Sequence, residues 1–180
     1  MRLKEEQIKR LAEKVRADLE KEVLIKARGE KSAIVSCISG TIGRDIAREQ
    51  NLQKDAEKLL DETIAAMGRA GAEIDRRKML KMVTEKLARE RKVIVSDSEE
   101  RISHLSHEIT DQLWKDDLAD FTDEGRALNC VKQTLASFYR VAGEIDEAVR
   151  TKLRNRAQGS RDWEVLYQKF YQEELVKRNL

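Results

Sequence analysis

The chain has 180 residues, of which 40% are hydrophobic and 39% charged, with only 4% aromatic residues and no proline. Its 36 basic and 34 acidic residues are finely interspersed, and the net charge of +2 argues against a surface devoted mainly to binding a polyanion. Helix-forming residues, few large side chains and no proline predict long helices that bury narrow apolar stripes rather than a broad interior.

The first predicted helix, over residues 4–22, recurs later in the chain. Residues 5–24 (EEQIKRLAEKVRADLEKEVL) match residues 99–118 (EERISHLSHEITDQLWKDDL) 94 positions further on. A unit used twice predicts two helical repeats, residues 1–95 and 96–180, packed on each other about a pseudo-twofold axis. The apolar positions that return are Ile8, Leu11, Val15, Leu19 and Leu24, as Ile102, Leu105, Ile109, Leu113 and Leu118.

A second helix follows a break at Gly29. It contains Gly40 and Gly43, each of which costs about 1 kcal/mol relative to alanine inside a helix. Because apolar residues at fourfold spacing continue past both glycines, we interpret the glycines as points of close approach between helices. These apolar residues are Ile34, Ile38, Ile42 and Ile46.

Two more helical stretches complete the first repeat. The third begins at Leu52 and runs to Gly68 and Gly71, which we expect to form a hinge. The fourth covers about residues 75–92 and leads to the short apolar run at 93–95. That run has the length of a strand, but the sequence suggests no partner strand, so we interpret it as a buried linker or helix end.

The second repeat follows the same plan. Ser96 and Glu99 form a capping-box pattern that begins its first helix, Thr122 and Asp123 can cap the second, and Ser160 opens the last. We therefore expect an all-α protein with eight helical stretches in two sets of four. The first one or two helices of each repeat should form an antiparallel bundle, from which the later helices project as arms.

The chain offers no apolar run long enough to span a bilayer, and its first 14 residues are charged and amphipathic, unlike a signal peptide. We therefore expect a cytoplasmic protein without membrane contact, and in that compartment two reduced cysteines.

Three segments resemble a known family. SEERISHLSHEI (98–109) and GEIDEAVRTKLRNRAQGSRDWEVLYQKFYQEELVKR (143–178) are similar to the opening and closing segments of the bacterial family catalogued as domain of unknown function 507. RRKMLKMVTEKLARERKVIV (76–95) is similar to the closing segment of its longer members, so the chain resembles two tandem copies. The resemblance implies a helical fold and a bacterial, soluble origin, but no activity, because the family is uncharacterised.

Four polar residues form a candidate metal site. His104, His107, Glu108 and Asp111 lie at i, i+3, i+4 and i+7, opposite the apolar stripe of their helix. Imidazole and carboxylate groups on one helical face can ligate a divalent metal. The first repeat has Arg10, Glu13, Lys14 and Ala17 at the equivalent positions, so a solvated polar face is the preferred interpretation, and we expect no metal or other cofactor.

The cysteines and one glycine motif also invite chemical interpretations. Cys37 and Cys130 coincide in the repeat alignment, but neither has a neighbouring histidine or a second cysteine at CxxC spacing. We interpret them as small buried side chains. SGTIGRD (39–45) lacks the flanking strands and the Lys-Ser/Thr pair of a phosphate loop.

Two surface segments are candidates for partner binding. Residues 150–161 carry five basic residues and no acid, which would suit a phosphate or RNA surface. They are Arg150, Lys152, Arg154, Arg156 and Arg161. The other segment is the last helix, where Trp163, Tyr167, Phe170 and Tyr171 share one face. We expect Trp163 and Phe170 to pack internally and place a protein-binding site at Trp163, Tyr167 and Tyr171, since Tyr and Trp often anchor interfaces.

The sequence thus favours a non-catalytic, monomeric interaction or scaffolding protein that binds an unidentified protein partner. An RNA- or ribosome-associated role through residues 150–161 is the second hypothesis. A metal-dependent enzyme using His104 and His107 is the third.

Overall fold

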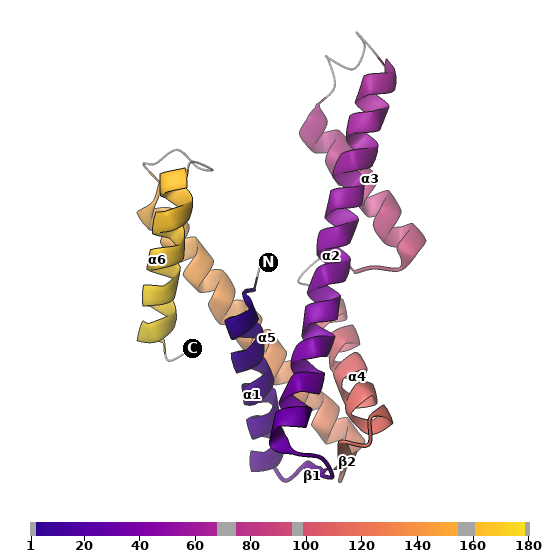
Figure 1. Ribbon diagram of the computed structural model, residues 1–180, viewed down its shortest axis with the longest axis vertical. Helices are drawn as coiled ribbons and strands as arrows, with labels where there is room; N and C mark the ends of the chain where they lie inside the picture. Colours follow the sequence, from indigo (N-terminus) through magenta and orange to yellow (C-terminus); the bar gives the residue numbers. More distant parts are fainter. Residues whose placement is uncertain (1–2, 68–74, 95–98, 155–160, 179–180) are drawn as a thin grey trace.

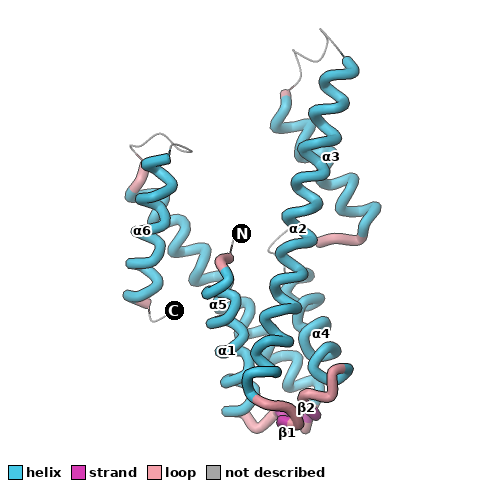
Figure 2. Tube along the Cα trace, viewed as in Figure 1, coloured by secondary structure: helices cyan, strands magenta, loops and turns pink. Residues whose placement is uncertain are grey.

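The computed structural model describes residues 3–67, 75–94, 99–154 and 161–178. This part of the chain is almost entirely helical, as the sequence predicts, with two very short strands (Figures 1 and 2). In chain order the elements are α1 (Glu5–Lys21), β1 (Ile25–Ala27), α2 (Lys31–Met67), α3 (Arg76–Arg91), α4 (Glu99–Lys115), β2 (Ala119–Phe121), α5 (Glu124–Lys152) and α6 (Arg161–Lys177).

An antiparallel four-helix bundle forms the base of the molecule. α1 and α4 run toward the strands, and α2 and α5 run away from them; α1 and α4 each pack on both α2 and α5 (Figure 1). The predicted apolar stripes supply the core, with Leu11, Leu19, Leu105, Ile109 and Leu113 inaccessible to solvent. Each such side chain contributes about 1.5–3 kcal/mol by leaving water. The bundle expected from the sequence is therefore confirmed.

The two strands were not expected. β1 pairs antiparallel with β2, with Lys26 opposite Asp120, and closes the bundle at the end where α1 and α4 terminate. Backbone hydrogen bonds from Thr122 N to Leu24 O (3.0 Å) and from Arg28 N to Leu118 O (2.9 Å) continue the pairing on either side. This small strand pair does not change the all-α class of the fold, and nothing in the sequence indicated it, because three-residue strands carry no detectable periodicity.

Six helices replace the eight predicted stretches in the described part of the chain. The predicted second and third stretches of each repeat form one continuous helix, α2 with 37 residues and α5 with 29. No proline interrupts either helix, and Ile38, Asp45 and Leu52 are buried at seven-residue spacing, so one face of α2 stays buried through this segment. The expected hinge at Gly68 and Gly71 lies outside the described residues, as does the capping residue Ser96.

The glycines of α2 do not mark close contacts between helices. A Cβ atom built on Gly43 would meet no heavy atom within 4 Å, and one on Gly40 would meet only the Arg44 side chain of the same helix, at 3.6 Å. The interpretation of close helix approach was therefore wrong. Gly29 has the tight surroundings instead, since a Cβ there would lie 2.7 Å from Cδ2 of Leu118.

Two arms diverge from the bundle in a V (Figure 1). The first arm consists of residues 52–67 of α2 together with α3, and the second arm consists of residues 145–152 of α5 together with α6. Each arm is a pair of packed helices. The projecting arms predicted from the sequence are present. They differ mainly in how far the apolar side chains between their two helices are buried.

Candidate interaction surfaces

The aromatic residues predicted to bind a partner pack within the second arm. The rings of Trp163 and Tyr167 stack with centroids 5.0 Å apart, and those of Tyr167 and Tyr171 stack at 5.8 Å. All three side chains are half-buried and pack against an apolar cluster of the same arm. This cluster consists of Ile145, Val149, Leu153 and Leu175. The predicted binding residues are therefore brought together, but largely as part of a second core.

Polar contacts fix the aromatic row further. The Tyr167 hydroxyl donates a hydrogen bond to Asp146, which also accepts one from Arg150 Nε at 2.7 Å. Burial, and then this contact with Asp146, raises the pKa of Tyr167 above its usual value. Burial likewise raises the pKa of Tyr171, whose hydroxyl is also in contact with Gln7 of α1. The second arm is thus braced against the bundle.

The basic segment is largely neutralised where it is described. Besides the Arg150–Asp146 pair, Lys152 Nζ lies 2.6 Å from Glu174 Oε1 and 5.8 Å from the ring centroid of Phe170. Hydrogen bonds from Lys152 and then Lys177 lower the pKa of Glu174 to about 2. Arg154 is exposed. Arg156 and the side chain of Arg161 lie outside the described part of the structure.

The four candidate metal ligands do not converge. His104 and Glu108 line a cavity of about 240 Å³ between α2, α4 and the end of α3, whereas His107 and Asp111 line a separate one of about 430 Å³. Glu108 accepts a hydrogen bond from Arg48 (2.7 Å), and Nδ1 of His107 lies 2.8 Å from the backbone oxygen of Ser103. Within the described residues, no three His, Cys, Asp or Glu side chains are grouped to hold a metal.

Both cysteines are free thiols; Cys130 is buried, as the sequence predicts, whereas Cys37 is only half-buried. Cys37 Sγ lies 3.6 Å from Asp116 Oδ2, and burial together with this carboxylate raises the pKa of Cys37 to about 11. Burial also raises the pKa of Cys130. Raised pKa values disfavour the thiolate, which is the reactive form of cysteine.

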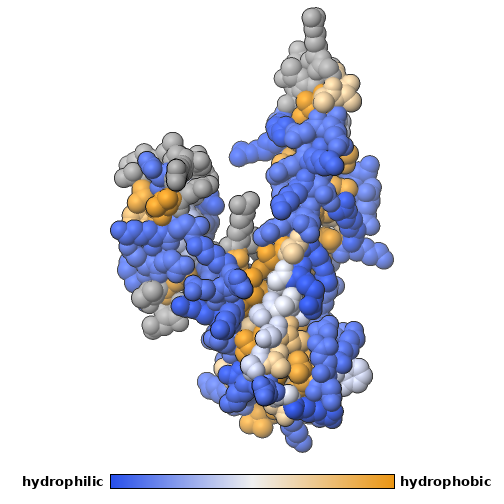
Figure 3. All heavy atoms as spheres, in the orientation of Figure 1, coloured by the Kyte–Doolittle hydropathy of each residue, from blue (hydrophilic) through white to orange (hydrophobic). Residues whose placement is uncertain are grey.

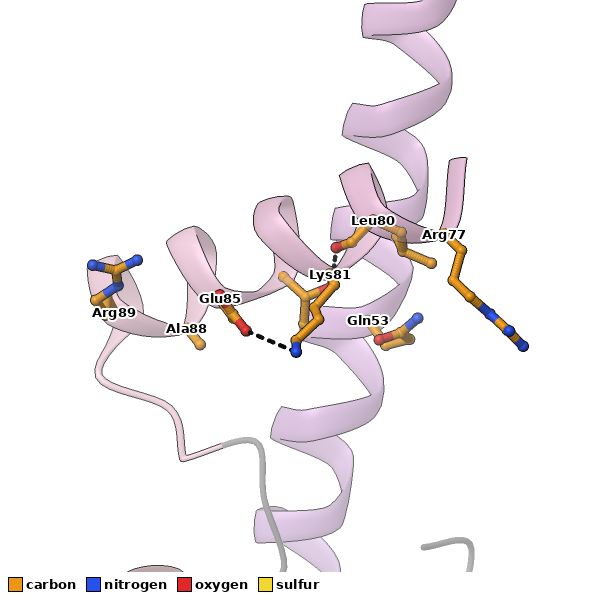
Figure 4. Close-up of a pocket in the computed structure, with 8 residues that line it drawn as sticks. Gln53, Arg77, Leu80, Lys81, Glu85, Ala88 and Arg89 are labelled. Atoms are coloured by element: carbon orange, nitrogen blue, oxygen red, sulfur yellow. Dashed lines mark hydrogen bonds and ion pairs between the residues drawn. The ribbon is translucent and has the colours of Figure 1, made fainter. Parts of the chain in front are cut away.

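The first arm buries its apolar side chains much less completely than the second arm does. α3 buries only the small residues Thr84 and Ala88, while Leu80, Val83 and Leu87 remain half-buried. Figure 4 shows α3 crossing α2, with Gln53 rising from α2 and Lys81 directed toward Glu85. These helices frame an inner groove of about 710 Å³. It is lined by Gln53, Arg77, Leu80, Lys81, Thr84, Glu85, Ala88 and Arg89.

A second groove runs along another face of α3. This outer groove, of about 580 Å³, contains the apolar side chains of Met79, Met82 and Val83. Met82 is 62% exposed, and Leu59 and Met67 are also exposed on this arm. Three of the six large apolar side chains that are exposed in the described structure thus belong to the first arm. Figure 3 shows small hydrophobic patches on this arm among mostly hydrophilic residues. The full lining is Asp75, Lys78, Met79, Met82, Val83, Glu85, Lys86 and Arg89.

Ion pairs hold α3 on α2 despite the thin apolar interface. Near the start of α3, Arg76 Nη2 lies 2.7 Å from Asp61 Oδ1, and at its end Arg91 Nη1 lies 2.5 Å from Asp55 Oδ2. Asp75 caps α3 by accepting hydrogen bonds from two backbone N–H groups, both at 3.1 Å. Both ion pairs are about half exposed, so each adds no more than about 1 kcal/mol to the attachment of α3 to α2, and the Asp75 cap stabilises α3 itself.

The surface of α3 is strongly basic. Residues 76–92 contain eight basic and two acidic residues. Arg77, Lys78 and Arg89 are exposed, and none forms an ion pair with an acidic side chain among the residues that the structure describes. The sequence analysis missed this surface, although a signal was present: a local excess of positive charge around two methionines three residues apart.

No described helix is long and apolar enough to cross a membrane. A search of curated proteins returned no match to the chain. The profile of a family described as "Protein of unknown function (DUF507)" matches residues 1–180, the whole length of the sequence. The chain therefore belongs to the DUF507 family.

Proposed function

We propose that this protein is a non-catalytic helical interaction or scaffolding protein that binds a macromolecular partner through its first arm. The observation that carries the proposal is the exposed apolar and basic surface of α3. Met82, which is 62% exposed, lies on this surface in a groove that Lys78 and Lys86 also line. Exposed apolar side chains rimmed by charge are typical of protein interaction sites. Methionine suits such a surface because its flexible side chain adapts to a partner.

The second arm supports this assignment by contrast. Its aromatic row covers the cluster around Ile145, so that arm has the closed packing of a structural element. We therefore move the predicted partner site from Trp163, Tyr167 and Tyr171 to α3. The RNA- or ribosome-associated role through residues 150–161 ranks lower, because two of its basic residues are paired with acids of the same arm.

A non-catalytic role fits the chemistry of the remaining candidates. The thiol of Cys37 has a raised pKa, and His104 and His107 face different cavities. Neither arrangement assembles a nucleophile, a base and a third orienting group of the kind that hydrolytic and transfer enzymes use. We further propose that the protein acts as a monomer in the bacterial cytoplasm.

The proposal includes an internal duplication with a pseudo-twofold axis. α1 and α4 have the same length and begin 94 residues apart, as do β1 and β2. Lys26 and Asp120, which lie opposite each other in the strand pair, are also equivalent in the repeat. Val23 and Asp117, another equivalent pair, both adopt positive φ, at 55° and 53°. Such matches are expected when two copies of one unit pack around an axis through the strands.

Photo-crosslinking tests the proposed binding surface. A photoreactive amino acid placed at Met82 should capture one or a few proteins from lysate, and unlabelled wild-type protein should compete for this capture. Val165 on α6 is the matched control, since it is 63% exposed against 62% for Met82. Capture that is identical at both positions, or that is insensitive to competition, would contradict the assignment of the first arm.

A further inference from the structure

We infer that the partner of α3 is an acidic amphipathic helix, which lies along the outer groove. The inference rests on the proposed function, and it adds the chemistry of the partner. Three features of α3 carry it: the spacing of its exposed apolar side chains, the extent of its free surface, and the sign of its charge.

The apolar spacing suits a helical partner. Met79, Met82, Val83 and Lys86 follow one another at i, i+3, i+4 and i+7 and all line the outer groove. This is the row that one helix presents to another when their side chains interdigitate. The alkyl chain of Lys86 extends the row while its ammonium group reaches the rim.

The free surface is long enough for several turns of a partner. α3 has 16 residues, which corresponds to about 24 Å of helix. Glu85 and Arg89 line both the inner and the outer groove, so the two hollows meet along one side of α3. A helix of about four turns can contact this surface over its full length, whereas a small molecule would fill only one hollow.

The charge selects an acidic partner. Lys78 and Arg89 line the outer groove beside the apolar row, and Arg77 lines the inner groove on the other side of α3. All three cations are exposed, and none forms an ion pair with an acidic side chain among the described residues. A partner helix with Leu or Ile on one face and Glu or Asp beside it would match both the apolar row and the basic rim. Such complementarity speeds association and selects against basic partners.

Nucleic acid and membranes match the surface less well. The first aromatic residue of the chain is Trp114, so α3 has no ring on which an exposed base can stack. Helices that lie on membranes bury a broad apolar face that includes bulky residues. On α3 the half-buried Leu80 and Leu87 are partly used in packing on α2, which leaves only the narrow row around Met82.

A designed peptide tests the inference on the full chain. The probe is a fluorescent peptide of about 18 residues with leucine at i, i+3, i+4 and i+7 and glutamate at most other positions. A peptide of the same composition with the leucines redistributed around the helix is its control. We expect the amphipathic peptide to bind at least about 10-fold more tightly than the redistributed one, as measured by anisotropy, and to slow hydrogen exchange within residues 76–91.

Variants of the protein locate the contact. Met82→Glu and Arg89→Glu should each weaken peptide binding by about 10-fold or more, and Val165→Glu on the second arm should leave it unchanged. Met82→Gln, which removes the apolar contact without adding charge, should have an intermediate effect. The four variants change three residues, all of them exposed, and circular dichroism tests whether each variant is folded.

Other outcomes would overturn the inference. Equal binding of the two peptides, or binding that Met82→Glu leaves unchanged, would refute it. Binding of oligouridylate RNA or of vesicles containing anionic phospholipid, lost in Met82→Glu while the peptide does not bind, would assign the surface to that ligand instead. Self-association that Met82→Glu abolishes in sedimentation velocity would assign it to a second copy. Specific crosslinking at Met82 without peptide binding would refute only the acidic helix, whereas loss of specific crosslinking would refute the proposed function itself.

Discussion

Replacing Arg101 with methionine should destabilise the bundle substantially. Arg101 lies on α4 with only 7% of its side chain exposed. Its guanidinium donates to Asp45 Oδ2 at 2.8 and 2.9 Å and to Glu49 Oε2 at 2.9 Å, both on α2. Asp45 is itself 9% exposed, so Arg101→Met would leave a buried carboxylate without its cation.

The size of the effect follows from the burial of these groups. A charge pair about 3 Å apart attracts by about 5–6 kcal/mol at an effective dielectric constant of about 20, and desolvation opposes much of this. Removing one partner of a buried pair typically costs about 3–5 kcal/mol. Because 21% of the Glu49 side chain is exposed to solvent, we expect Arg101→Met to lower the free energy of unfolding by about 3 kcal/mol, the lower end of this range. That corresponds to a fall in Tm of about 6–12 °C for a chain of this size.

Urea unfolding, followed by far-UV circular dichroism, measures this change. The matched control is Arg48→Met, which breaks the pair between Arg48 and Glu108 across the same two helices. Those side chains are 47% and 27% exposed, so the control should lose no more than about 1 kcal/mol. Adding Asp45→Leu to Arg101→Met removes the unpaired buried carboxylate and should restore most of the lost free energy of unfolding. The reasoning would be refuted if Arg101→Met cost no more than Arg48→Met.

Three further changes have defined outcomes. Gly43→Ala should raise the free energy of unfolding by about 0.5–1 kcal/mol in urea titrations, because alanine favours helix and the added methyl group meets no neighbour; a loss of stability would show that the site is crowded. Asp75→Ala should cost about 1 kcal/mol through loss of the α3 cap, visible as faster hydrogen exchange in α3 but not in α6. The lowered pKa of Glu174 means that its pairing with Lys152 and Lys177 stabilises the folded state fully above pH about 4.5 and loses this effect as the pH falls to about 2. The difference in thermal stability between wild type and Glu174→Gln should therefore narrow across that window, and a constant difference would contradict the assignment.

The regular part of the fold could be predicted because its signal is local. The helix expected over residues 4–22 is α1, Glu5–Lys21, and the one expected over 75–92 is α3, Arg76–Arg91. In both cases apolar side chains at helical spacing and a change in composition at the ends mark the element. The same pattern identified the residues of the bundle core.

Features that depend on distant contacts could not be predicted in the same way. Lys26 and Asp120 become strand residues only because the turns after α1 and α4 meet in space, 94 positions apart in sequence. Whether a side chain stays exposed is likewise decided by its tertiary partner. Tyr167 is covered because α6 packs on α5, whereas Met82 stays exposed although it also lies on an amphipathic helix.

The unbroken course of α2 makes it a lever. Its 37 residues span about 55 Å, and the 21 residues from Ala47 to Met67 place the tip of the first arm about 32 Å beyond the bundle. A tilt of about 10° at the base of such a rod displaces its tip by about 5–6 Å. Repacking of Ile34, Ile38 or Ile42 in the bundle would therefore be amplified at α3, and a load applied to α3 would be transmitted to the core through one continuous backbone.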